Sequence, residues 1–311
     1  MKLSVVTSLY RSAPHLPEFV ARASAAAAAF AGDDWEMILV NDGSPDASLA
    51  AALAEREKEP RIRVVDLSRN FGHHKALMTG VSLARGEWVY LIDCDLEEPP
   101  ELLSALTAAL TGDPEADVAY GVQKQRRGGW FERVSGALFY RLMRWSADFD
   151  YPADTLTARL MSRRYVDALK QFDDREYDLW VNFALAGFRQ LPVPAEKGDK
   201  GSSAYTLRRK VRHAVESLTA SGAGPLYLIF ILGWIIFFAS LAQMAFLVVN
   251  KLFFEVPAGW SYLTASIWGL GGIIMISLGT VGIYLAKVFV ETKKRPGVII
   301  RRVYDERDPR P

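Results

Sequence analysis

The sequence predicts an α/β protein with a mostly parallel sheet covered by helices, followed by a transmembrane helical hairpin at its carboxyl end. Two observations support this prediction. Short apolar runs rich in β-branched residues alternate with helical patterns in the first part of the chain, an arrangement typical of parallel sheets with helices on both faces. Later, two long segments, 225–249 and 260–286, contain no charged residue at all.

The expected strands and helices follow from these patterns. The strands are Leu3–Leu9, Trp35–Val40, Ile62–Leu67, Trp88–Ile92 and Asp117–Val122, and the helices between them include Pro14–Phe30, Asp46–Glu57, His74–Ala84 and Pro99–Leu110. Ligands of such sheets bind beyond the carboxyl ends of the strands. Polar residues cluster at those ends, in Thr7–Arg11, Asn41–Ser44, Ser68–Asn70 and Asp93–Asp95.

Length and composition exclude several classes of protein. The 311 residues suit two units, and a chain that is 50% hydrophobic and 23% charged is neither disordered nor fibrous. The net charge of +1 gives no indication of nucleic-acid binding. A single cysteine, Cys94, excludes a disulfide framework and a thiolate zinc cluster.

The two uncharged segments are long enough to cross a bilayer, since a helix of the length of 225–249 covers ~37 Å against a hydrocarbon core of ~30 Å. Buried core helices are the alternative interpretation. The short link between the segments allows only a tight hairpin. Lys and Arg flank its outer ends and are scarce at its tip, so the positive-inside rule places both termini in the cytoplasm.

These features predict five regions: a cytosolic α/β domain over 1–200, an amphipathic basic juxtamembrane segment over 201–224, transmembrane helices at 225–249 and 260–286, and a basic cytoplasmic tail over 287–311. We expect a multi-pass protein of the inner (cytoplasmic) membrane. The first residues have too short an apolar run for a signal peptide, so Cys94 should be a reduced thiol.

Two aspartates follow the strand that ends at Ile92. Asp93 and Asp95 are two residues apart, so they share one face if the strand continues. Paired carboxylates repel unless a cation lies between them, and Mg²⁺ or Mn²⁺ with substrate phosphates is the natural occupant. Glu97 and Glu98 add negative charge. A solvated acidic turn before the next helix is the alternative.

Further polar residues are expected at the same edge. Asp42 could accept hydrogen bonds from a base or ribose, or could form an Asx turn with Gly43. Arg69, Lys75 and the helix that begins near His74 could meet phosphate charge. An acid, nearby cations and a metal-binding pair at one sheet edge indicate a nucleotide-diphosphate site.

Motifs of other α/β enzymes are missing from the sequence. No glycine-rich G-x-G-x-x-G follows the first strand, which disfavours a dinucleotide-binding oxidoreductase. The P-loop pattern G-x4-G-K-[ST] and the hydrolase pattern G-x-S-x-G do not occur either.

Four motifs, SVVTSLY, VNDGSPD, LSRNFGHHKALMTG and LIDCDLEEPPELL, resemble in order and spacing the family-2 glycosyltransferases of the GT-A fold. They are most similar to the polyprenyl-phosphate branch, which includes dolichol-phosphate mannose synthase and bactoprenol glucosyltransferases. The resemblance continues through FERVSGALFYRL and ARLMSRR to GIYLAKVFVETKKRP.

The resemblance implies roles for matching residues. Thr7, Leu9 and Asp42 would hold the base and ribose, with Arg69, Lys75 and Asp93 also in the donor site. Asp93, Asp95 and Glu97 would hold the metal, Asp95 most directly. Arg126 or Arg127 would lie near the acceptor phosphate with Arg133 and Ser135, and Arg159 near the reacting groups.

The sequence departs from the family pattern at three places. Thr157 stands where relatives commonly have aspartate, Ala204 where they have lysine, and SLYRSA lacks their acidic residue. The change at Thr157 weakens any catalytic-base role there. A lipid phosphate has a second pKa of about 6, so it is already an anion that needs positioning rather than deprotonation.

We therefore expect an inverting, metal-dependent glycosyltransferase. It would move a sugar from a nucleotide-diphosphate donor, specifically a UDP-sugar, to a polyprenyl phosphate. The product would serve cell-envelope glycan or lipid modification. The expected partners are the membrane and further copies of the chain, in a homo-oligomer such as a tetramer, and not nucleic acid. The alternatives are an inactive nucleotide-binding scaffold, a processive polysaccharide synthase, whose Q-x-x-R-W motif is absent, and a lipid-sugar flippase, which two spans make unfavourable.

Overall fold

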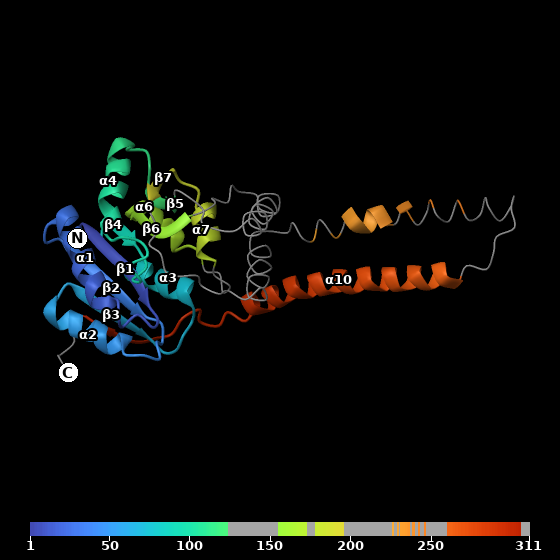
Figure 1. Ribbon diagram of the computed structural model, residues 1–311, viewed down its shortest axis with the longest axis horizontal. Helices are drawn as coiled ribbons and strands as arrows, with labels where there is room; N and C mark the ends of the chain where they lie inside the picture. Colours follow the sequence, from blue (N-terminus) through green and yellow to red (C-terminus); the bar gives the residue numbers. More distant parts are fainter. Residues whose placement is uncertain are drawn as a thin grey trace. The chain divides into compact units, whose positions relative to one another are not determined.

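The computed structural model describes residues 1–123, 155–172, 178–195 and 260–305, with scattered positions between 226 and 246. The described chain falls into two units: one holds the sheet with its covering helices, and the other holds a single long helix. Figure 1 shows most of the α/β unit in blue to yellow, its C-terminal segment in red, and the long helix, α10, in orange.

The first unit is built on an eight-stranded sheet of order β7-β5-β6-β4-β1-β2-β3-β8. Its strands are β1 (Leu3–Leu9), β2 (Trp35–Asn41), β3 (Ile62–Leu67), β4 (Trp88–Leu91), β5 (Val118–Gln123), β6 (Thr155–Ser162), β7 (Gln190–Ala195) and β8 (Ile300–Tyr304). Strands β1 to β4 run parallel, whereas β6 and β8 are antiparallel to their neighbours. The mostly parallel sheet predicted from the sequence is confirmed.

Helices cover both faces of this sheet. They are α1 (Leu16–Ala31), α2 (Ser48–Lys58), α3 (His73–Leu83), α4 (Leu102–Gly112), α6 (Arg163–Leu169) and α7 (Leu179–Leu185). Consecutive residues of one strand point to opposite faces, so Val5 packs in the cluster with α1 and α4, and Val6 packs in the cluster with α3, α6 and α7. This two-sided burial explains why the strands read as unbroken apolar runs.

The second unit contains α10 (Trp260–Thr292), the one helix among the described residues that is long and apolar enough to cross a membrane. Its apolar part, Leu270–Thr292, has a mean hydropathy of 2.1, and none of it is buried. The helix continues past the predicted end at Ala286, because charges such as Lys287 mark the edge of the apolar part and not the end of the backbone hydrogen bonding. It ends shortly before Lys294, whose φ is +46°, and Pro296.

The first predicted span, 225–249, and the juxtamembrane segment, 201–224, lie largely or wholly outside the described residues. The tail predicted over 287–311 contains a feature that the sequence pattern did not reveal. Its residues Ile300–Tyr304 form β8, which pairs antiparallel with β3 at the edge of the eight-stranded sheet. In Figure 1 this red segment returns to the blue strands.

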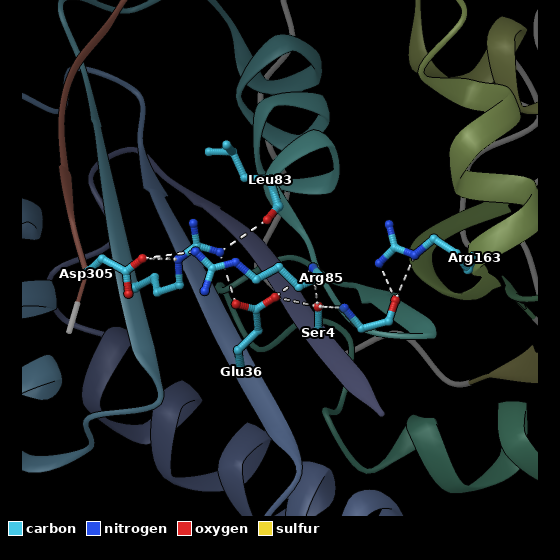
Figure 2. A network of polar contacts seen from close by, with 8 residues as sticks. Ser4, Glu36, Leu83, Arg85, Arg163 and Asp305 are labelled. Atoms are coloured by element: carbon cyan, nitrogen blue, oxygen red, sulfur yellow. Dashed lines mark hydrogen bonds and ion pairs between the residues drawn. The ribbon is translucent and has the colours of Figure 1, made fainter. Parts of the chain in front are cut away.

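A polar network joins strands β1, β2 and β3 to the residues just before β4 and just after β8, at the end of the sheet where β1 begins (Figure 2). Glu36 is the centre of this network. One of its carboxylate oxygens accepts hydrogen bonds from Ser4 Oγ and from the backbone N–H of Arg85, both at 2.8 Å. The other oxygen accepts from Arg63 Nη1 at 3.0 Å. The side chains of Glu36 and Arg63 are only 3% and 7% exposed. Asp305, just after β8, contacts Arg63 at 3.4 Å and Arg85 at 3.1 Å.

Glu36→Ala should destabilise the α/β unit by about 3–5 kcal/mol, because it leaves the buried Arg63 guanidinium without its main carboxylate partner. The loss is measurable as a lower melting temperature of the purified protein in detergent. Glu18→Ala is the control: Glu18 pairs with Arg22 on the surface, and exposed pairs contribute about 0–1 kcal/mol. Equal losses in the two variants would contradict this account of the network.

Candidate active site

The register of the parallel strands brings several polar residues to one edge of the sheet. Leu9 of β1 lies opposite Asn41 of β2, and Val6 lies opposite Leu91 of β4, so Asp42 and Asp93 follow their strands at the same edge. A cavity of about 360 Å³ opens there. It is lined by Ser8, Tyr10, Arg11, Ser12, His15, His73, Asp93, Cys94 and Asp95.

Asp93 is held from two sides. Thr157 of β6 donates its hydroxyl to Asp93 Oδ2 at 2.8 Å, and His73 Nε2 lies 3.3 Å from Asp93 Oδ1. The other ring nitrogen of His73 is 2.9 Å from Ser8 Oγ. Asp93 therefore joins β6 to the start of α3 and the end of β1, which fixes the direction of its carboxylate.

Asp95 lies in a turn that its own side chain stabilises. Asp95 Oδ1 accepts from the backbone N–H of Glu97 at 3.0 Å, and Leu96 between them has a φ of +62°. A positive φ is strained for a branched side chain and persists only where the surroundings impose it. The turn leaves the Asp95 carboxylate at the wall of the cavity.

Glu98 is the buried acid of this loop. Its side chain accepts two backbone N–H groups of β6, Thr157 N at 2.9 Å and Ala158 N at 2.6 Å. The carboxylate thus replaces a neighbouring strand as the hydrogen-bond partner of these two residues. Together with the Thr157–Asp93 contact, it ties both ends of the acidic loop to β6.

The predicted set of three metal-binding carboxylates is not confirmed as a preformed cluster. Within the ranges that the structure describes, no three His, Cys, Asp or Glu side chains gather as a metal site. The reason is that Asp93 binds Thr157 and His73, while Asp95 closes the turn to Glu97. Two carboxylates beside substrate phosphates still fit a hard divalent cation, since Mg²⁺ commonly has few protein ligands.

Asp42 has a role that the sequence did not specify. It is 2% exposed, and its two oxygens accept the backbone N–H groups of Phe71 at 2.7 Å and Gly72 at 3.0 Å. Gly43 beside it has a φ of +56°, and a Cβ at this position would meet Arg69 C and Asn70 N at 2.4 Å. Asp42 and Gly43 therefore hold the loop after β3 against the loop after β2.

The other predicted donor residues differ in exposure. Thr7 and Leu9 are fully buried, and the Leu9 carbonyl accepts the Asp42 N–H at 3.0 Å, so both shape the edge from inside. Arg69 is exposed, with its guanidinium over the Phe71 ring at 4.1 Å. Lys75 lies in the first turn of α3. None of these four lines the cavity.

Arg159 is fully buried on the face of the sheet covered by α7. Its guanidinium carbon lies 3.4 Å from the centre of the Phe183 ring and 5.2 Å from that of Trp180. Burial lowers the pKa of Arg159 to about 10, so it stays charged at neutral pH. It does not line the cavity, although it follows Thr157 by two residues on the same face of β6.

Cys94 lies between the two aspartates and is 5% exposed. Its thiol donates to the Ser8 carbonyl at 3.2 Å. Burial, reinforced by the charges of Asp93 and Asp95, raises the pKa of the Cys94 thiol to about 11. The thiol therefore stays protonated at neutral pH, and its hydrogen bond joins β1 to the acidic loop.

The predicted acceptor residues Arg126, Arg127, Arg133 and Ser135 lie outside the described residues. Conversely, sequence reasoning did not identify His15, His73 or Glu98 as site residues. Nothing in a single sequence separates Glu98 from the adjacent Glu97, since only the partner strand distinguishes them. Thr157 was noticed as a departure from the family pattern, but its contact with Asp93 was not foreseen.

Glu98→Gln should destabilise the acidic loop by about 1–3 kcal/mol, because glutamine offers one oxygen and turns an NH₂ group toward the second backbone N–H. The measurement is the melting temperature together with amide hydrogen exchange at Thr157 and Ala158, which should lose protection. Glu97→Gln serves as the matched control. Unchanged protection of both amides in Glu98→Gln would show that the carboxylate does not hold β6.

Known proteins similar to this chain are named as glycosyltransferases. Residues 4–169 match the family Glycosyl transferase family 2. A protein of Mycobacterium tuberculosis (strain CDC 1551 / Oshkosh), whose name assigns it to the glycosyltransferases, is 44% identical over 305 residues, which cover 98% of this chain and 89% of that protein. An uncharacterized glycosyltransferase of Synechocystis sp. is 32% identical over 95% of this chain and 93% of its own length.

Two further similarities concern an acceptor and the fold. The undecaprenyl-phosphate 4-deoxy-4-formamido-L-arabinose transferase of Enterobacter sp. (strain 638) is 28% identical over 97% of this chain and 93% of that protein. A mannosyltransferase of Pyrobaculum calidifontis, solved with GDP-Man and Mn²⁺, has a TM-score of 0.50 at 18% identity, covering 94% of this chain and 86% of that one, and supports the GT-A fold. The chain belongs to glycosyl transferase family 2 and is a glycosyltransferase of the GT-A fold.

Proposed function

We propose that this glycosyltransferase transfers a sugar from a nucleoside diphosphate to a polyprenyl phosphate at a membrane surface. The observation that carries the proposal is the cavity at the carboxyl edge of the sheet, where Asp93 and Asp95 face Arg11, His15 and His73. Such a mixture of carboxylates, a guanidinium and imidazole rings suits a diphosphate bound together with a divalent cation.

The residues of the cavity would have different roles in donor binding. Asp93 and Asp95, which both line the cavity, are the carboxylates that would hold Mg²⁺ or Mn²⁺, Asp95 most directly. A bound divalent cation would stabilise the negative charge that develops on the departing diphosphate. Arg11, which has a φ of +56° and donates its backbone N–H to Ser44 Oγ at 2.7 Å, lines the same cavity.

The reaction needs no protein base. An oxygen of the lipid phosphate attacks the anomeric carbon, the bond from that carbon to the diphosphate oxygen breaks, and the nucleoside diphosphate leaves with the electron pair. The configuration at the anomeric carbon is inverted. The absence of an acidic residue at Thr157 agrees with an acceptor that is already an anion.

The apolar helix supports a lipid acceptor. Leu270–Thr292 has no buried residue, so it needs a partner for its apolar surface, and a bilayer is the natural one. The Enterobacter relative is named as a transferase to undecaprenyl phosphate. A UDP-sugar donor, a homo-oligomer, a second membrane span and cytoplasmic termini belong to this proposal.

The direct test is incubation of the purified chain with polyprenyl phosphate and a panel of nucleotide sugars, beginning with UDP-sugars, followed by mass spectrometry of the lipid. A lipid whose mass increases by one sugar is expected. An inactive scaffold would bind nucleotide and give no product, and a processive synthase would give a polymer. Either of these results would refute the proposal.

Asp95→Asn should lower the transfer rate by about 10²-fold, which corresponds to roughly 3 kcal/mol of lost transition-state stabilisation. Asparagine keeps the oxygen that accepts the Glu97 N–H, so the turn should persist. EDTA should abolish transfer in the wild-type protein, and Mg²⁺ or Mn²⁺ should restore it. Asp33→Asn, a change on a fully exposed side chain, is the control. Full activity of Asp95→Asn in excess EDTA would remove Asp95 from the metal site.

The orientation can be tested by thiol labelling, because the one native thiol, Cys94, is buried. With Ala258→Cys, a membrane-impermeant maleimide should react in intact cells. With Ser202→Cys it should react only after lysis, since the Lys/Arg asymmetry places this side in the cytoplasm. The reverse pattern would invert the proposed topology.

A further inference from the structure

The strand β8 follows the apolar helix and returns to the catalytic sheet. Its pairing with β3 contains a bulge: Asp66 lies opposite Arg302, and the next residue, Leu67, lies opposite Ile300. Arg301 is therefore the extra residue of β8. Bulges of this kind redirect a side chain out of the regular alternation, and they are frequent next to active sites.

The redirected Arg301 binds the end of β3 in two places. Its Nη1 donates to Asp66 Oδ2 at 3.2 Å, and its Nη2 donates to the Ser68 carbonyl at 2.7 Å. The ladder continues beyond the bulge, because Ser68 N–H donates to the Ile299 carbonyl at 2.9 Å. The loop after β3 is thus tied to β8 at its first residue.

Asp66 connects Arg301 to the loop after β2. It is only 2% exposed, and its second oxygen accepts from Asn41 Nδ2 at 2.8 Å. Asn41 in turn accepts the Ser44 N–H through its own side-chain oxygen at 3.3 Å. Arg301, Asp66 and Asn41 therefore form one line of hydrogen bonds from the edge strand to the turn that contains Asp42.

The two loops reached from Arg301 also contact each other. Asp42 accepts the N–H groups of Phe71 and Gly72, and Gly43 leaves no space for a side chain against Arg69 and Asn70. A displacement of Ser68 or Asn41 would therefore move both loops together. These loops carry the candidate donor residues Asp42 and Arg69.

We infer that Arg301 is a positioning residue for the nucleotide end of the active site, so that donor affinity depends on the strand that follows the membrane helix. The inference rests on the proposed function. Arg301 is 59% exposed, and among the described residues it reaches the loops of the site through Asp66 and Ser68, so its own energy of pairing is modest. Its effect is to fix the relative positions of two loops that must meet one ligand.

The test compares Arg301→Gln with wild type in the full-length protein in detergent. Calorimetry with UDP and GDP in the presence of Mn²⁺ gives donor-side affinity, and steady-state kinetics give the KM for polyprenyl phosphate. We expect Arg301→Gln to weaken binding of the preferred nucleotide about tenfold while the lipid KM changes less than twofold. Hydrogen exchange should increase in 41–44 and 68–72.

Two further variants separate positioning from a general loss of stability. Arg301→Lys should recover part of the affinity, because an ammonium can pair with Asp66 but cannot also reproduce the fork to the Ser68 carbonyl. Arg295→Gln removes the same charge from an exposed position of the tail and should bind nucleotide like wild type. If Arg301→Gln does not fold, Arg301→Lys carries the comparison, and wild-type affinity in that variant overturns the inference.

The remaining outcomes distinguish failure of this inference from failure of the proposed function. Wild-type nucleotide affinity in a folded Arg301→Gln overturns the inference and leaves the proposed function intact. A wild-type protein that binds neither UDP nor GDP refutes the proposed function, and with it the inference. Equal weakening in Arg301→Gln and Arg295→Gln would attribute the effect to net charge and not to position.

Discussion

The parallel register of β1 with β2 and β4 is the constraint on which the candidate site depends. It places the ends of three strands at one edge, so that Asp42 and Asp93 come within reach of the loop after β1. A slip of one residue in any strand would turn its buried side chains toward the wrong face. Burial on both faces, with Val5 in one core cluster and Val6 in the other, makes such a slip costly. The geometry of the site is therefore fixed by the core.

Local patterns were sufficient to predict this central part of the fold. Leu3–Leu9 and Ile62–Leu67 were predicted with the boundaries that the structure has, because apolar runs of this length between turn signals have few alternatives. The strands β6, β7 and β8 were not predicted. Their formation depends on partners distant in the chain: β8 pairs with β3 across more than half the sequence, and two N–H groups of β6 bind Glu98. A single sequence contains no local signal for such pairings.

The residue types of the candidate site were predictable from the sequence, but the contacts that each residue makes were not. The acidic pair, the polar strand ends and the family were all indicated by the motifs. The sequence could not reveal that Asp93 binds Thr157 and His73, that Asp42 binds the backbone of Phe71 and Gly72, or that Arg159 is enclosed by aromatic rings. These contacts join residues from different elements. The local sequence around each residue would be the same if that residue lay in an exposed turn, so the sequence alone does not reveal the contact.

The central claim is that a nucleoside diphosphate and a divalent cation meet in the cavity between the ends of β1 and β4. A structure of the full chain in lipid nanodiscs with bound Mn²⁺ and UDP, or GDP if that is the preferred nucleotide, tests it most directly. We expect the diphosphate in the space lined by Ser8, Arg11 and His73, with the cation bound to Asp95. Nucleotide bound elsewhere, for example in the groove beside Arg22 and Ser104 between α1 and α4, with the acidic loop unoccupied, would contradict it.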